Sequence, residues 1–195
     1  MNPIEVLVEE HRLITRASEC LARMIGAAML ARRLKFLQAE SIVDFIGAYA
    51  DAWHHAKEEH ELFPRVAARK PSWDVDHLAD LGADHERCRA CAREMHESFR
   101  EGAHGDPEET QRFCRNAQEW IDLIRMHIYK EDRVAFPLME HALTADDTLA
   151  LLQSYAALEA DPRFAGIDAK YRTAIEELEF VYNIVPPSNS PDHGG

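Results

Sequence analysis

Apolar residues recur every three to four positions over most of the chain, which is the spacing of one buried face of an α-helix. Glycine is scarce, at 8 of 195 residues, and alternating β-branched runs are nearly absent, so strands are not expected. Helices are predicted over residues 3–26, 38–68, 74–100, 107–141, 145–162 and 165–185. The pattern therefore predicts an all-α protein.

The first four predicted helices are long and are joined by short connections, of which "EGAHGDP" (residues 101–107) is the clearest turn. Short connections place consecutive helices antiparallel, so we expect an up-down-up-down four-helix bundle with two extra C-terminal helices. The expected division is a bundle over residues 1–142, a helical extension over 143–185, and a disordered tail, "PPSNSPDHGG", over 186–195.

Ionisable residues interrupt the apolar faces of all four long helices at related positions. The second and fourth helices carry "HHAKEEHELFP" (54–64) and "HIYKEDRVAFP" (127–137), which begin 73 residues apart and match at His, Lys, Glu, Phe and Pro. A solitary His precedes each motif, by 43 and 42 positions. The His and Glu of each motif are four residues apart, so they stack on one helix face. The ionisable residues predicted on the inner faces are His11, His54, Glu58, His85, His127 and Glu131.

Four imidazoles and two carboxylates in one core need a partner, because an unpaired buried carboxylate costs several kcal/mol or becomes protonated. A bound cation satisfies both kinds of group. Glu58 and Glu131 can each bridge two metal ions while each imidazole binds one, which gives a nitrogen and oxygen donor set that suits iron or manganese. With octahedral metals and a solvent-derived bridge, coordination positions stay open, and a small molecule could bind there.

The two motifs and the solitary His residues resemble the hemerythrin or HHE cation-binding family over residues 3–142. The resemblance implies an oxo- or hydroxo-bridged centre of two non-haem iron ions. Its implied ligands are His11, His54, Glu58, His85, His127 and Glu131. The oxygen-carrying members have a His-x-x-x-His pair on the third helix, whereas Arg89 stands four residues after His85 here. One imidazole is therefore missing, so the resemblance favours the branches tied to iron sensing, nitric oxide handling or peroxide chemistry.

We therefore expect a protein that binds or senses O2, nitric oxide or peroxide at open iron positions. One alternative is an enzyme that reduces nitric oxide or disproportionates peroxide at the same site. Another is a metal-stabilised regulatory or iron-handling bundle whose last two helices contact a protein partner or a second copy, since the segment 165–185 is apolar enough to do so.

The remaining residues near the motifs are expected to be structural. Pro64 and Pro137 should kink or end their helices, because proline lacks a backbone N–H. Cys88 lies three residues after His85 and could respond to oxidants there. The residues expected on a solvated helix face are His55, Glu59, His60 and Glu61. His55 and Glu59 are also four residues apart and offer an alternative ligand pair, shifted by one residue. Glu58 and Glu131 each stand six residues before a proline, and this shared spacing favours His54 and Glu58.

Composition narrows the expected partners and location. The formal net charge is −13, with both signs interspersed, so neither nucleic acid nor an anionic membrane surface is expected to bind. No apolar run approaches the roughly 20 residues of a membrane-spanning helix, and the N-terminus lacks a signal-peptide pattern. Four cysteines are too few for a secreted disulfide framework. The expected location is the cytoplasm.

Overall fold

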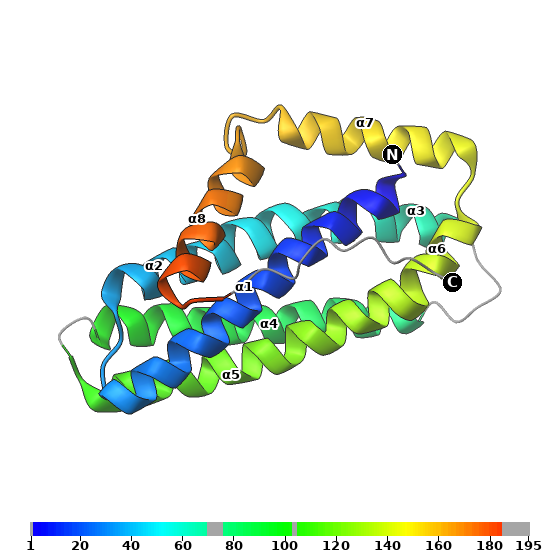
Figure 1. Ribbon diagram of the computed structural model, residues 1–195. Coiled ribbons are helices and arrows are strands. Elements are labelled where there is room, and N and C mark those ends of the chain that lie inside the picture. The colour runs from blue at the N-terminus through cyan, green and yellow to red at the C-terminus, as the bar shows by residue number, and fades with distance from the viewer. Residues whose placement is uncertain (1, 70–75, 103–104, 185–195) are drawn as a thin grey trace, which may run out of the picture.

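The computed structural model describes residues 2–69, 76–102 and 105–184, and within them every regular element is helical (Figure 1). The α-helices are α1 (Pro3–Ala31), α2 (Phe36–Phe45), α3 (Phe63–Ala68), α4 (Asp76–Gly102), α5 (Pro107–Lys130), α6 (Phe136–Ala142), α7 (Ala145–Glu159) and α8 (Ile167–Val181). Three π-helical segments interrupt them: η1 (Ile46–His55), η2 (Glu58–Leu62) and η3 (Glu131–Ala135). The tail predicted to be disordered, residues 186–195, lies outside the described residues, and the division at residue 142 stays a prediction.

The long helices form the predicted up-down-up-down bundle, in which α1, the α2–α3 rod, α4 and the α5–α6 rod follow in order and each runs antiparallel to the one before it (Figure 1). The N-terminus of α1 is fixed by a capping box between Asn2 and Glu5, with Pro3 in the first turn. The helix continues to Ala31, five residues beyond the expected end at Gly26, and Arg32 then takes a left-handed conformation (φ 51°). The α1–α2 connection is therefore shorter than the sequence indicated.

The two rods that carry the repeated motifs contain all three π-helical segments. Pro64 and Pro137 stand in the first turn after η2 and η3. Proline cannot donate to the carbonyl four residues earlier and its ring crowds that carbonyl, so a wider preceding turn relieves the conflict. Both helices continue past the proline. The prolines therefore widen the turn that holds Glu58 and Glu131 instead of ending the helix.

A π turn contains one more residue than an α-helical turn, so the positions that form the buried face after it are shifted by one residue. The 3.6-residue period of the helix predicted over residues 107–141 places Val134 and Leu138 on its buried face, yet their side chains are 53% and 38% exposed. Ala135, Phe136 and Met139 are buried in their place. The prediction for this part of the fourth helix was wrong because it assumed an unbroken 3.6-residue period.

The two C-terminal helices pack along one side of the bundle, over α1 and the α2–α3 rod (Figure 1). Leu151 and Tyr155 of α7 join the apolar cluster around α3 and α6, and Ile175 of α8 joins the larger cluster at the other end. Arg69 makes a bidentate ion pair with Asp147, in which Nε and Nη2 each donate to a carboxylate oxygen at 2.7 Å. Similar polar links join α1 and η1 to α8, at Arg16–Glu179 (2.7 Å) and Tyr49–Asp168 (2.9 Å). The apolar face of the last helix is thus covered by its own chain.

None of the helices in the described part of the chain combines the length and apolarity that a bilayer crossing requires.

Replacement of Ile175 by alanine tests whether α8 belongs to the core. The side chain is fully buried, so Ile175→Ala should lower the free energy of unfolding by about 2–5 kcal/mol. Phe180→Ala is the matched control in the same helix: it removes a larger side chain that is 87% exposed and should cost less than about 0.5 kcal/mol. Urea unfolding of both variants measures the difference. Equal small losses would show that α8 does not stabilise the bundle.

Candidate metal centre

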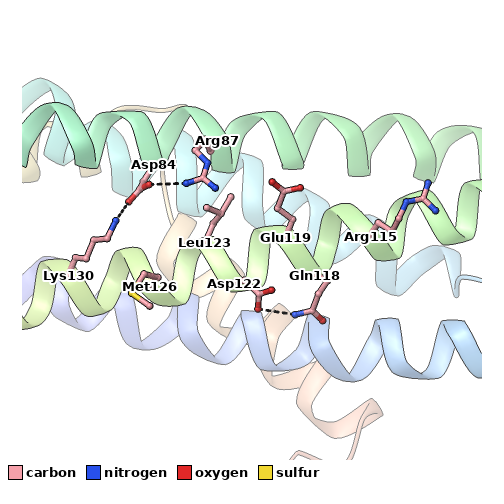
Figure 2. Close-up of a pocket in the computed structure, with 9 residues that line it drawn as sticks. All are labelled: Asp84, Arg87, Arg115, Gln118, Glu119, Asp122, Leu123, Met126 and Lys130. Carbon is pink, nitrogen blue, oxygen red and sulfur yellow. Dashed lines mark hydrogen bonds and ion pairs between the residues drawn. The ribbon is translucent and has the colours of Figure 1, made fainter.

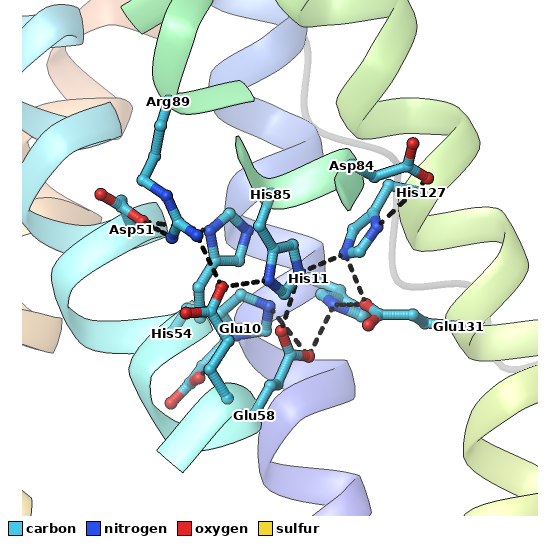
Figure 3. A network of polar contacts seen from close by, with 12 residues as sticks. Glu10, His11, Asp51, His54, Glu58, Asp84, His85, Arg89, His127 and Glu131 are labelled. Atoms are coloured by element: carbon cyan, nitrogen blue, oxygen red, sulfur yellow. Dashed lines mark hydrogen bonds and ion pairs between the residues drawn. The ribbon is translucent and has the colours of Figure 1, made fainter. Parts of the chain in front are cut away.

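All six residues predicted on the inner helix faces meet at the middle of the bundle (Figure 3). Each is at most 1% exposed, although each carries an ionisable group. They come from all four long elements of the bundle: His11 from α1, His54 and Glu58 from the α2–α3 rod, His85 from α4, and His127 and Glu131 from the α5–α6 rod.

The imidazole Nε2 atoms face the two central carboxylates. His11 Nε2 lies 3.2 Å and His127 Nε2 3.1 Å from Glu131 Oε2. On the other carboxylate, His54 Nε2 lies 3.5 Å from Glu58 Oε1 and His85 Nε2 lies 3.4 Å from Glu58 Oε2. Glu58 and Glu131 thus form the centre of the arrangement, with nitrogen atoms on both sides.

The structure adds a residue that the sequence interpretation had assigned to solvent. His55 is only 2% exposed, and its ring stacks on that of His85, with centroids 3.8 Å apart and planes 11° apart. The prediction of a solvated His55 was wrong. It rested on α-helical geometry, whereas η1 is π-helical up to this residue, and the wider turn brings His54 and His55 to the core together.

These seven residues, from here on the His/Glu cluster, divide into two groups that could each hold a metal ion. One group is His55, Glu58, His85 and His127; the other is His11, His54, Glu58 and Glu131. Within each group the candidate donor atoms all lie within 4.8 Å of one another. Glu58 is common to both groups, as a carboxylate shared by two neighbouring cations would be.

Each imidazole turns its Nδ1 toward a carboxylate outside the cluster. The pairs are His11–Asp132 (2.7 Å), His54–Glu10 (2.9 Å), His55–Asp51 (3.4 Å), His85–Glu59 (2.6 Å) and His127–Asp84 (3.9 Å, an ion-pair separation). We call these five acids the outer carboxylates. Hydrogen bonds at Nδ1 of His11, His54, His55 and His85 fix these rings and their tautomers, so that the Nε2 lone pairs point inward, as metal-binding imidazoles require.

The sequence interpretation missed the outer carboxylates, although a signal was present. Glu10 and Asp84 directly precede His11 and His85, but each serves the His of a neighbouring helix instead of its own neighbour in the sequence. Glu59 was assigned to a solvated face and is in fact half-buried against His85. An acidic residue next to a predicted ligand is therefore the sequence signal for an outer carboxylate. The imidazole that each acid faces depends on how the helices pack.

Lys57 and Arg89 hold three of the outer carboxylates in turn. Lys57 is fully buried, and its ammonium contacts Glu10 and lies 3.7 Å from the centroid of the Trp53 ring. The Lys57 ammonium also lies 5.5 Å from the centroid of the Tyr155 ring. Because Tyr155 belongs to α7, the C-terminal helices take part in this contact. Arg89 donates to Asp51 (2.7 Å) and to Glu59 (2.9 Å).

Asp84 connects the cluster to the surface. It lies at one end of a pocket of about 500 Å³ between α4 and α5, where it accepts a hydrogen bond from Lys130 at 2.7 Å and faces Arg87 (Figure 2). Its carboxylate is 11% exposed, and His127 behind it is fully buried. Solvent therefore reaches the acid that faces His127 but not the imidazole itself.

The donor atoms fit a cation. Both oxygens of Glu58 and of Glu131 are buried without a hydrogen-bond partner among the described residues, and so are Nε2 of His11 and of His55. Orphaned buried acceptors of this kind are rare, because each costs about 1–3 kcal/mol or more when charged. Imidazole nitrogens and carboxylate oxygens are donors for iron, manganese and zinc.

In the metal-free protein, protons partly replace a cation. Burial, reinforced by repulsion from Glu131, raises the pKa of Glu58 well above its usual range. Burial alone would also raise the pKa of Glu131, but the charges of His127 and His11 outweigh burial and lower it. For His11, burial alone would lower the pKa, yet Asp132 and Glu131 raise it to about 9. The same competition, with Glu131 as the main partner, raises the pKa of His127 to about 10.

Cys88 is buried, and that burial raises the pKa of its thiol to about 12. The thiolate is the reactive form, so the thiol of the folded protein is a poor target for oxidants.

The fold and the cluster together define a helical-bundle protein with a buried site suited to metal cations. A family model, the hemerythrin HHE cation binding domain, matches residues 2–139. The chain belongs to this family. No curated protein and no solved structure matched the chain.

The pKa values predict that cation uptake releases protons. At pH 7 His11 and His127 are both protonated, because their pKa values of about 9 and about 10 lie above that pH. A cation must displace these protons, so its affinity should rise with pH, by up to about tenfold per unit for each proton, until pH passes 9 to 10. Calorimetric titration of the metal-free protein with Zn²⁺, in buffers of different ionisation enthalpy, counts the protons. An affinity independent of pH would contradict this assignment.

Proposed function

We propose that the protein is a non-haem di-iron protein that binds or senses a small molecule, such as O2, nitric oxide or peroxide. The observation that carries this proposal is the pair of central carboxylates, Glu58 and Glu131, buried with no hydrogen-bond partner among the described residues and flanked by imidazoles. A bundle has no structural need for two such groups, and a pair of cations compensates them.

The proposed ligands are His11, His54, Glu58, His85, His127 and Glu131. Glu58 belongs to both candidate groups and so suits a bridging role. Glu131 lies near His11 and His127, which belong to different groups, and suits the same role. When bound, iron supplies open coordination positions for a small ligand and a change of one electron per metal ion.

The chain itself determines what reaches the iron. The cluster residues are at most 2% exposed, so bulk water and large substrates are excluded. The ring of Phe136 stacks on His11, with centroids 5.3 Å apart, and Phe63 stacks on His85 at 6.1 Å. These apolar walls admit a diatomic molecule or peroxide more readily than a charged or extended substrate. The outer carboxylates hold each imidazole in one orientation, which keeps the site preorganised.

The alternative of a bundle that uses its last helix to contact a partner is less well supported. The buried side of α8 is already covered by the bundle, through Ile167, Tyr171, Ile175 and Leu178. Phe180 is its only large apolar side chain more than half exposed among the described residues. The proposed function therefore centres on the buried site.

Removal of one central charge tests the proposed ligands. Glu58→Gln and Glu131→Gln keep the side-chain shape but lose the charge, so the fold should persist while iron affinity falls by more than tenfold. Glu61→Gln, also in η2 and partly exposed, is the control and should keep its iron. Iron per chain is measured after anaerobic loading with Fe²⁺ and gel filtration, with circular dichroism to verify folding. Full iron content in both central variants would refute the assignment.

The optical spectrum tests the small-molecule proposal. Protein loaded with Fe²⁺ should take up iron near two ions per chain and develop charge-transfer bands on exposure to O2, nitric oxide or peroxide. Bands that disappear when the gas is removed indicate reversible binding, and many turnovers per chain indicate an enzyme. A protein that takes up only zinc, or a single ion, would overturn the di-iron proposal.

A further inference from the structure

We propose that His55 is a fifth imidazole ligand, so that the metal position beside His85 and His127 receives three imidazoles while the position beside His11 and His54 receives two. This inference rests on the proposed di-iron function. It states that the two metal positions differ in the number of imidazoles that each receives.

The first observation is the place of the His55 ring. It belongs to the candidate group with Glu58, His85 and His127, whose donor atoms lie within 4.8 Å of one another. The ring lies parallel to that of His85, 3.8 Å away, and edge-on to that of His127, 5.9 Å away. His55 therefore lies within the cluster, in the candidate group that does not contain His11.

The second observation is an unused nitrogen. Nε2 of His55 is buried and has no hydrogen-bond partner among the described residues. A histidine kept only for packing would be expected to satisfy both nitrogens, because an orphaned buried polar atom costs about 1–3 kcal/mol. On the opposite side of the ring, Nδ1 faces Asp51 Oδ1 at 3.4 Å. The His55 ring thus faces a carboxylate outside the cluster with Nδ1, as the other four imidazoles do, and its Nε2 remains for a cation.

The third observation is the anchor behind the ring. The Arg89 guanidinium donates through Nη1 to Asp51 (2.7 Å) and through Nη2 to Glu59 (2.9 Å). These are the carboxylates of His55 and of His85, so one guanidinium fixes both stacked rings. Such a shared anchor is expected for two ligands of one cation and has no purpose for a solvated side chain.

A fifth imidazole changes what the site can bind. It fills one of the coordination positions that four imidazoles leave open, and it fills that position on the His85 side. The small molecule then binds at the position beside His11 and His54, with one molecule expected per chain instead of two.

The test compares His55→Gln with His60→Gln, an exposed histidine in the same rod. Each protein is loaded anaerobically with Fe²⁺, and iron release to a chelator is followed over time. In His55→Gln, one of the two irons should leave more than tenfold faster, and nitric oxide uptake should rise above one per chain. His60→Gln should match the wild type. If His55→Gln also matches the wild type in release rate and nitric oxide uptake, the inference is overturned.

A second variant covers the case in which His55→Gln does not fold. Asp51→Ala removes the half-buried carboxylate that holds His55 and should speed the release of one iron by about tenfold. Unchanged release would overturn the inference. Failure of the di-iron proposal is distinguishable, because wild-type protein would then not hold two irons at all.

Discussion

The neutralisation of two carboxylates at the centre of an apolar bundle is the constraint on which the other polar features depend. Glu58 and Glu131 are fully buried, where an uncompensated charge would cost several kcal/mol. Positive charge must therefore come close to them, either as protons on the surrounding imidazoles or as bound cations. The family to which the chain belongs, the hemerythrin HHE cation binding domain, identifies cations as the natural solution.

Charge alternates outward from this centre. The imidazoles surround the two carboxylates, the outer carboxylates surround the imidazoles, and Lys57, Arg89 and Lys130 hold outer carboxylates in turn. Each layer places groups of opposite charge beside the layer within it, so a network of many ionisable groups can lie in one core. Because buried polar networks are costly when only partly satisfied, the outer layers are as necessary to the site as the inner one.

The fold and the six inner residues could be predicted because they depend on local periodicity and on a repeat that doubles its signal. His55 and the exposed faces of Val134 and Leu138 could not, since both follow from π turns that add a residue without changing the side-chain pattern around them. Pro64 and Pro137 are the sequence signal for two of those turns, because each proline follows one of them. The outer carboxylates were hidden for a different reason: their partners lie on other helices, and only packing determines which acid faces which imidazole.

The contact between Lys57 and Tyr155 joins the buried site to a helix that the family model does not include. The family match ends at residue 139, while Tyr155 lies in α7 and its ring faces the Lys57 ammonium. A fragment cut at the family boundary would lack the Tyr155 ring beside the Lys57 ammonium and the Phe164 ring, whose centroid lies 5.5 Å from that of Trp53. The side chains that surround the buried site in this protein therefore extend beyond the segment that the family model matches.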